Sequence, residues 1–287
     1  MDASLTLFDI VPGRTIADRF EVVRANRQGG FSTAFEIRDL DASEPRELQL
    51  FPVGLFEGGG QATAFRALLA PWLKVDSVHV LRVRELLTLA DDILAVITDL
   101  PTGEPLRARL EREKSLTRDE VIALGTRMLE GLAEIHAQDL VHGDIKPNTI
   151  FVEGEEENVR PLLVDGGVTH GLWTAKNLGE KTALIGTPYY APIEQFGGDA
   201  PDVRSDIYNV ATVLYECATG RMPWAGKTFL DVFQSKLSDP PEMRSDVSDI
   251  QVDPELEAVI RKGCLADRNR RYASAAEFQA ALEAIRD

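Results

Sequence analysis

The stretch that decides the fold reads His142-Gly143-Asp144-Ile145-Lys146-Pro147-Asn148-Thr149. Asp144 and Lys146 place opposite charges two positions apart, and Pro147 limits the freedom of the backbone around them. A long helical pattern precedes this stretch and strand-like segments follow it. We therefore expect it to be a loop between regular elements, and the rest of the chain indicates what this loop does.

The composition excludes several classes of protein. The chain has 287 residues, of which 44% are hydrophobic, enough for one large domain or two lobes. It contains no run of about 18 uncharged apolar residues, and Met1–Ser4 lacks the basic start of a secretory signal. We expect a soluble, cytoplasmic segment, either complete or the cytoplasmic domain of a longer protein.

Net charge narrows the choice of partners. A formal charge of −16 repels nucleic-acid phosphates and anionic lipid headgroups, so neither nucleic-acid binding nor direct membrane insertion is expected. The four histidines lack the spacing of a zinc site, and both cysteines lie in helical patterns typical of core residues. A protein partner of unknown identity is the remaining expectation.

Short apolar runs separated by Gly, Asp and Pro predict a small β-sheet in the first third of the chain. One helix is expected at 61–74, where Pro71 would kink or end it early. The predicted strands are Phe20–Ala25, Thr33–Arg38, Glu47–Phe51, Val78–Leu87 and Ile93–Thr98.

Helical patterns dominate after a hinge-like turn near residue 100. Thr117 and Glu120 have the spacing of a capping box, and apolar residues at i+3 and i+4 steps continue to Ile135. This pattern predicts a long helix. Further helices are predicted near 204–219, 228–237, 254–265 and 274–285.

Residues 19–287 resemble a Hanks-type bacterial serine/threonine protein kinase domain. This resemblance implies an α+β, bilobal kinase-like fold: a lead-in at 1–18, a small β-rich lobe with one helix at 19–99, and a larger, mainly α-helical lobe at 100–287. The motifs that carry it are 142–147, Gly186-Thr187-Pro188-Tyr189-Tyr190-Ala191-Pro192-Ile193-Glu194-Gln195, Ser205-Asp206-Ile207-Tyr208, and Asp267 with Arg271-Tyr272.

The resemblance implies catalytic and cofactor-binding roles. Asp144 would orient the substrate hydroxyl and Lys146 would meet the transferring phosphate. Asp165 would bind a cation, the only metal contact implied, while Gly29 and Gly30 belong to the glycine-rich phosphate loop. ATP and magnesium are the cofactors of such a site.

The resemblance also implies two architectural contacts. Glu194 should pair with Arg271 and tie the activation segment to the second lobe. Asp206 should anchor the loop that contains Asp144.

Four positions depart from the family pattern. Thr149 stands where the family has the asparagine that holds magnesium. Leu50 and Leu68 are placed at the lysine and glutamate that hold the nucleotide phosphates, so a charged pair would have become an apolar pair. Gly166 replaces the phenylalanine of D-F-G. We predict an inactive or mobile activation segment.

Bulky side chains are also expected in the nucleotide site. Leu48 stands where a small alanine is usual and Phe151 where a leucine is usual, which predicts a prefilled cleft that needs no nucleotide. Arg27 or Arg66 would be the residues to stand in for the missing lysine, although guanidinium and ammonium groups differ in reach and geometry.

These departures favour a pseudokinase: a kinase fold used for protein interaction, scaffolding or allosteric control, with little or no phosphoryl transfer and no expected cofactor. In that case Asp144 and Lys146 are remnants of a catalytic loop, and Gly29, Gly30 and Asp165 are remnants of a cofactor site. Two alternatives stay open, an atypical working kinase that uses ATP and magnesium and a switch that binds ATP without catalysis.

Two segments are candidate interaction surfaces. One is the activation segment, where Trp173 either anchors a partner or packs inward and where Thr169, Thr174 and Thr182 are potential phosphate acceptors. The other is the helix near Phe229–Leu237.

Overall fold

The fold was analysed in a computed structural model. It describes residues 10–28, 30–89, 92–177, 189–224, 226–244 and 252–286. Two compact units result. The smaller unit comprises Met1–Asp76 and Leu81–Pro101, and the larger unit comprises Ser77–Val80 and Thr102–Asp287.

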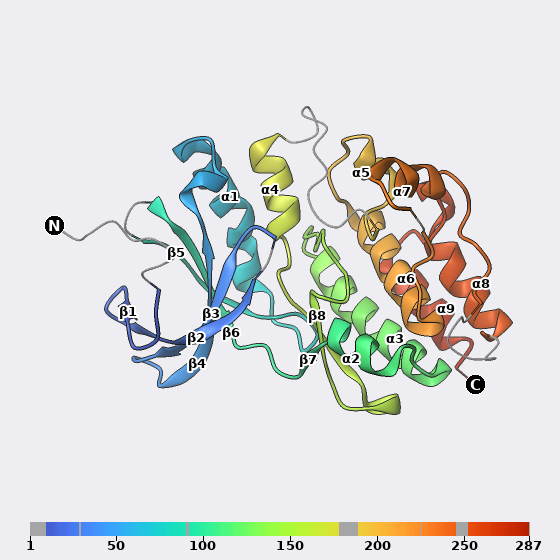
Figure 1. The fold of residues 1–287 in the computed structure, drawn as a ribbon, viewed down its shortest axis with the longest axis horizontal. Helices are drawn as coiled ribbons and strands as arrows, with labels where there is room; N and C mark the ends of the chain where they lie inside the picture. Colours follow the sequence, from blue (N-terminus) through green and yellow to red (C-terminus); the bar gives the residue numbers. More distant parts are fainter. Residues whose placement is uncertain are drawn as a thin grey trace. The chain divides into compact units, whose positions relative to one another are not determined.

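Six antiparallel strands form the sheet of the smaller unit, in the order β1-β2-β3-β4-β6-β5 (Figure 1). Three residues, Ala17 to Arg19, separate the first two strands, and Ala17 and Asp18 both have positive φ. Part of the expected lead-in therefore belongs to the sheet. The strands are β1 (Thr15–Ile16), β2 (Phe20–Gln28), β3 (Thr33–Asp39), β4 (Glu44–Phe51), β5 (Val83–Thr88) and β6 (Leu94–Asp99).

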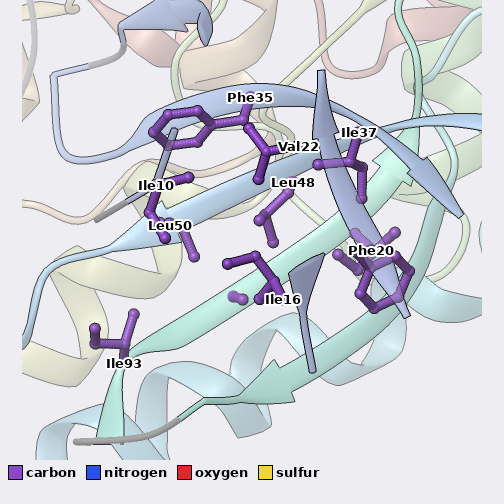
Figure 2. Packing of buried hydrophobic residues seen from close by; sticks show 11 residues of the cluster. Ile10, Ile16, Phe20, Val22, Phe35, Ile37, Leu48, Leu50 and Ile93 are labelled. Carbon is purple, nitrogen blue, oxygen red and sulfur yellow. The ribbon is translucent and has the colours of Figure 1, made fainter. Parts of the chain in front are cut away.

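The two faces of β4 have different roles. Leu48 and Leu50 lie on one face, inside an apolar cluster that also contains Phe20 from β2 (Figure 2). Phe51 points to the opposite face because side chains alternate along a strand. There its ring lies 5.2 Å from the ring of Phe65, in helix α1 (Gly59–Leu69).

The expected apolar pair of Leu50 with Leu68 is therefore wrong. Leu50 points away from the face that Phe51 shares with α1, and Leu68 is only half-buried on that helix. The placement was one residue out of register, which moves a side chain to the other face of a strand. Glu47 and Gln49 occupy the face shared with Phe51.

Helix α1 ends early, as Pro71 predicted. It stops at Leu69 and continues as a 3-10 turn, η3 (Ala70–Lys74), which contains Pro71 near its start. This is the early ending expected from the proline. A shorter 3-10 turn, η2 (Val53–Leu55), follows β4.

The larger unit is built around helix α3 (Arg118–His136), which packs against α6 and α9. The predicted capping box at its start is confirmed: the Glu120 N–H donates to the Thr117 hydroxyl, and the Thr117 N–H donates to the Glu120 carboxylate. The other elements are α2 (Leu106–Glu113), α4 (Val168–Lys176), α5 (Ile193–Phe196), α6 (Val203–Thr219), α7 (Phe229–Lys236), α8 (Pro254–Gly263), α9 (Ala275–Glu283), the sheet β7 (Glu104–Pro105), β8 (Ile150–Glu153) and β9 (Arg160–Leu163), and the 3-10 turns η5 (Glu156–Asn158) and η7 (Arg268–Arg270).

Helix α4 is the main departure from the predicted elements. Gly166, Gly167 and Gly171 made a loop the expected structure here. Instead Gly167, with a φ of +75°, is the residue from which α4 begins. Burial of Leu172 and Trp173 stabilises a helix that local propensity does not favour.

The register of β4 can be tested by comparing the stabilities of two variants. Leu50→Lys places an unpaired ammonium group in the apolar cluster and should lower the free energy of unfolding by about 3 kcal/mol or more. Leu68→Glu, on the half-buried side of α1, should lower it by less than about 1 kcal/mol. Urea denaturation followed by circular dichroism measures both, and equal losses would contradict the register.

Candidate functional site

Asp206, in the first turn of α6, holds the loop that contains Asp144. Its buried carboxylate accepts the N–H groups of His142 and Gly143, each at 2.8 Å, and lies 2.9 Å from Nε2 of His136. Burial opposes ionisation of Asp206, but these hydrogen bonds and the nearby histidines lower its pKa below the ordinary value. Asp206 therefore has the anchoring geometry that the resemblance implied.

Asp144 and Lys146 contact each other directly. The Lys146 ammonium donates to the Asp144 carboxylate at 2.7 Å, and both side chains are about four-fifths buried, with 20% and 17% of their surfaces exposed. Burial raises the pKa of Asp144, and the attraction of Lys146 offsets only part of that rise. The two charges are thus paired with each other.

Thr149 closes the same loop through its hydroxyl. The Oγ1 atom donates to the Asp144 carbonyl at 2.6 Å and accepts the Lys146 N–H at 3.1 Å. A threonine hydroxyl has one hydrogen to donate, and here that hydrogen stabilises the loop. Asn148 is exposed while Thr149 is buried, so a one-residue slip that would bring Asn148 into place does not occur.

The segment after β9 turns sharply into α4. Asp165 has a φ of +63° and Gly167 a φ of +75°, and α4 starts at Val168. Gly166 lies between them. In the described part, the activation segment is thus helical through Lys176 rather than a loop, and residues 178–188 lie outside the described residues.

The side chains of the activation segment differ in exposure. Trp173 is buried, with 3% of its surface exposed, which favours the inward-packing interpretation. Thr169 is also buried, whereas Thr174 is exposed and donates to the His170 carbonyl. Thr182 lies outside the described residues.

Arg271 holds the end of the activation segment, at Glu194, within the larger unit. Its guanidinium makes two hydrogen bonds to the Glu194 carboxylate, at 2.6 and 2.9 Å, and it is fully buried. This confirms the pair that the resemblance implied. A two-pronged contact between arginine and carboxylate fixes orientation as well as distance.

In the smaller unit, the residues beside the glycine-rich turn are bonded to β4. The Arg27 guanidinium binds the Glu47 carboxylate at 2.6 Å and Asn26 donates to the same carboxylate at 2.7 Å. Gln49 donates to the Ser32 hydroxyl at 2.8 Å. These contacts lie on the β4 face that carries Phe51.

Leu48 does not have the role predicted for it in the nucleotide site. Leu48 belongs to the apolar cluster on the other face of β4, so its predicted overlap with adenine is wrong. Phe151 is buried in β8 of the larger unit. Arg66 donates to the Leu86 carbonyl, and Arg27 binds Glu47. Neither arginine therefore takes the place of the missing lysine.

Glu47 and Gln49 are the residues that sequence reasoning missed. Strict alternation along Glu47–Phe51 was the available signal, because it puts both polar residues on one face and both leucines on the other. Of the two predicted phosphate-loop glycines, Gly29 lies outside the described residues. Gly30 has open space where a Cβ would stand, so no neighbouring protein atom requires a glycine there.

Two features are absent from the described ranges. No helix there is long and apolar enough to span a membrane. No group of three or more His, Cys, Asp or Glu side chains there is arranged to hold a metal ion.

Comparison with known sequences places this site in context. A family model described as "Protein kinase domain" matches residues 69–282. PkaB of Streptomyces coelicolor, a serine/threonine-protein kinase, is 37% identical over 159 residues, covering 54% of this chain and 38% of PkaB. The serine/threonine-protein kinase pkn3 of Myxococcus xanthus is 26% identical over 280 residues, covering 95% of this chain and 51% of pkn3. The chain thus spans about half or less of the length of these relatives.

Comparison with solved structures agrees on the fold. Structures of the kinase domain of Mycobacterium tuberculosis PknI match with TM-scores of 0.70 to 0.74 at 18 to 19% identity. The match covers 98% of this chain and 99% of that domain in one structure, and 96% and 98% in another. At this identity the similarity shows a shared fold.

The hydroxyl of Thr149 makes a testable contribution to the loop. Thr149→Val keeps the shape of the side chain but leaves the Asp144 carbonyl and the Lys146 N–H without their partner. We expect a loss of about 1–3 kcal/mol in the free energy of unfolding, measured by urea denaturation. Asn148→Ala, at the exposed neighbour, is the control and should change it by less than about 0.5 kcal/mol.

Asp206 should make the free energy of unfolding depend on pH in the acidic range. Because its pKa is lowered in the folded chain, its contribution is complete above the ordinary value near 4 and is lost as the pH falls through the lower folded value. Asp206→Asn should therefore cost about 3 kcal/mol or more at pH 7, and the difference from wild type should shrink toward pH 2. A difference that is constant across pH, measured by thermal unfolding, would show that the charge is not the cause.

Proposed function

The chain belongs to the protein kinase domain family, and we propose that it acts as a pseudokinase, which recognises or regulates a protein partner with little or no phosphoryl transfer. The proposal rests on how the charged groups of the two units are used. It includes weak or absent binding of ATP and no required metal.

The buried carboxylate of Glu47 is the observation that carries the proposal. Working kinases place an alanine and a lysine two residues apart on this strand, facing the nucleotide. On the β4 face shared with Phe51, Glu47 and Gln49 have that spacing. Glu47 has no exposed surface, and its carboxylate binds the Arg27 guanidinium, so the cation beside the glycine-rich turn is engaged by a carboxylate rather than by a phosphate.

The partners of this pair strengthen the argument. Arg27 is the cation beside the glycine-rich turn, and its guanidinium binds Glu47. Gln49 is uncharged and its amide binds Ser32. The face that would need to attract phosphate is thus occupied by side chains that satisfy one another.

The catalytic loop supports the same conclusion. The Thr149 hydroxyl donates its hydrogen to the Asp144 carbonyl, and a neutral hydroxyl is a weaker magnesium ligand than the amide oxygen of asparagine. Phosphoryl transfer depends almost wholly on positioning and on electrostatic stabilisation by such groups. Loss of the lysine and the asparagine should reduce turnover by many decades.

A protein partner in the cytoplasm fits the remaining properties of the chain. A net charge of −16 disfavours nucleic acid and anionic membranes as binding surfaces. The ordered Asp206 and Glu194–Arg271 contacts preserve a rigid larger unit, which suits recognition even without catalysis.

A weakly active serine/threonine kinase is the second candidate. Asp144, Lys146 and Asp165 are retained, and the relatives PkaB and pkn3 are named as kinases. Incubation with labelled ATP and magnesium or manganese separates the two candidates. Incorporation by the wild type that both Asp144→Ala and Asp165→Ala abolish would establish the kinase and overturn the pseudokinase.

Nucleotide binding supplies the direct test. Millimolar ATP with magnesium should raise the melting temperature of the wild type by less than about 1 °C, since a ligand stabilises only in proportion to its occupancy. The double variant Glu47→Ala, Gln49→Lys removes the buried anion and restores a lysine, and should show a larger nucleotide-dependent rise. A shift of several degrees in the wild type would contradict the proposal, and calorimetry with ADP and ATP would then distinguish a nucleotide switch from a kinase.

A further inference from the structure

Helix α7 buries a lysine. Only 1% of the surface of Lys236 is exposed, whereas lysine side chains are seldom fully buried unless they are paired with an acid. The Lys236 ammonium donates to the Tyr189 carbonyl at 2.7 Å and to the Tyr208 hydroxyl at 3.0 Å. Both acceptors are uncharged, and no carboxylate among the described residues pairs with this ammonium. Its hydrogen bonds thus go to neutral groups.

Two aromatic rings also lie against the ammonium. The Lys236 Nζ atom lies 5.0 Å from the centre of the Tyr208 ring and 5.1 Å from the centre of the Trp224 ring. Such cation–π contacts offset part of the cost of burying a positive charge. They do not restore the hydration that a charge loses in the interior, so burial lowers the pKa of Lys236 well below its ordinary value.

The other titratable and charged groups that influence Lys236 come from α5, α6, the end of α8 and the residue after η7. Tyr208 in α6 and Cys264 at the end of α8 stay neutral because burial raises the pKa of both, to about 12 for the Cys264 thiol. Glu194 in α5 and Arg271 after η7 bind each other, so their charges cancel. Lys236 is therefore the group of this set that can change its charge between neutral pH and about pH 10.

The lysine connects two segments of the larger unit. Tyr189 lies in the last part of the activation segment, before α5, and Lys236 is the last residue of α7. Phe229, Leu230 and Leu237 are exposed on and just after the same helix, which is the second interaction surface expected from the sequence. The amine that takes up a proton is thus bonded to the activation segment and belongs to the helix that carries this apolar surface.

We propose that Lys236 makes the stability of the larger unit depend on pH: uptake of a proton by its amine weakens the packing of α7 against α6 and Tyr189, and loss of that proton strengthens it. The charged form must give up water that the two acceptors and the two rings replace only in part. The neutral amine still carries N–H groups that can bind the Tyr189 carbonyl. This property goes beyond partner recognition, and it holds whether or not the chain transfers phosphate.

The lowered pKa fixes the direction of the pH dependence. The unfolded chain exposes Lys236, whose ordinary pKa is about 10.4, and so it binds more protons than the folded chain between the lowered pKa and about pH 10. The free energy of unfolding should therefore rise with pH across this window. A difference of one proton changes the unfolding equilibrium constant about tenfold per pH unit.

Urea unfolding of the full chain, followed by far-ultraviolet circular dichroism, compares the wild type with Lys236→Met at pH 7, 8, 9 and 10. Methionine fills a similar volume and carries no titratable group. The unfolding constant of the variant, divided by that of the wild type, should rise at least about tenfold from pH 7 to pH 10. All other titratable groups are common to both chains, so their contributions cancel in this ratio.

Lys262→Met is the matched control. Lys262 lies 4.1 Å from the centre of the Tyr272 ring, but 43% of its side chain is exposed and it binds Glu277, so its ratio should stay within about twofold. Lys236→Gln, a second variant, removes the charge while it keeps an N–H donor, and it should repeat the rise. The proposal is overturned if neither variant of Lys236 shows the rise, or if Lys262→Met shows an equal one.

Discussion

The carboxylate of Asp206 is the interaction on which the larger unit depends. A buried charge is stable only when hydrogen bonds replace the water that it loses, and Asp206 obtains them from two consecutive backbone N–H groups and from His136. Because those N–H groups belong to His142 and Gly143, the loop has one allowed path. That path brings Asp144 and Lys146 together, and it places the His142 carbonyl where the Gly167 N–H, just before α4, donates to it.

Charge is used differently in the two units. In the larger unit, the acidic and basic groups of the catalytic loop and of the Glu194–Arg271 contact maintain an architecture common to the family. In the smaller unit, Arg27 and Glu47 form an ion pair, and we propose that it replaces the contacts that a phosphate makes in a working kinase. Under the proposed function, the retained architecture keeps the kinase fold while these paired charges account for the loss of its chemistry.

Sequence motifs predicted a local feature from its spacing and a distant contact from the family resemblance. The capping box at Thr117 and the Glu194–Arg271 contact could be recognised because each involves residue types with few alternatives at those positions. The register of β4 could not be read as safely, because a shift by one residue exchanges Leu50 for Gln49 and reverses the face of every side chain. Helix α4 escaped prediction because its stability comes from docking, and local propensity around Gly167 and Gly171 points to a loop.

The composition of the smaller unit has a consequence for chemical labelling. Lys74 is its only lysine, and it lies exposed at the end of η3, far along the chain from β4. Reactive nucleotide analogues that survey kinases by acylating a lysine beside the phosphates would find no such amine on β4, where Gln49 stands. Labelling by those reagents would then depend on Lys146 of the catalytic loop, whose ammonium is bound to Asp144, and not on β4.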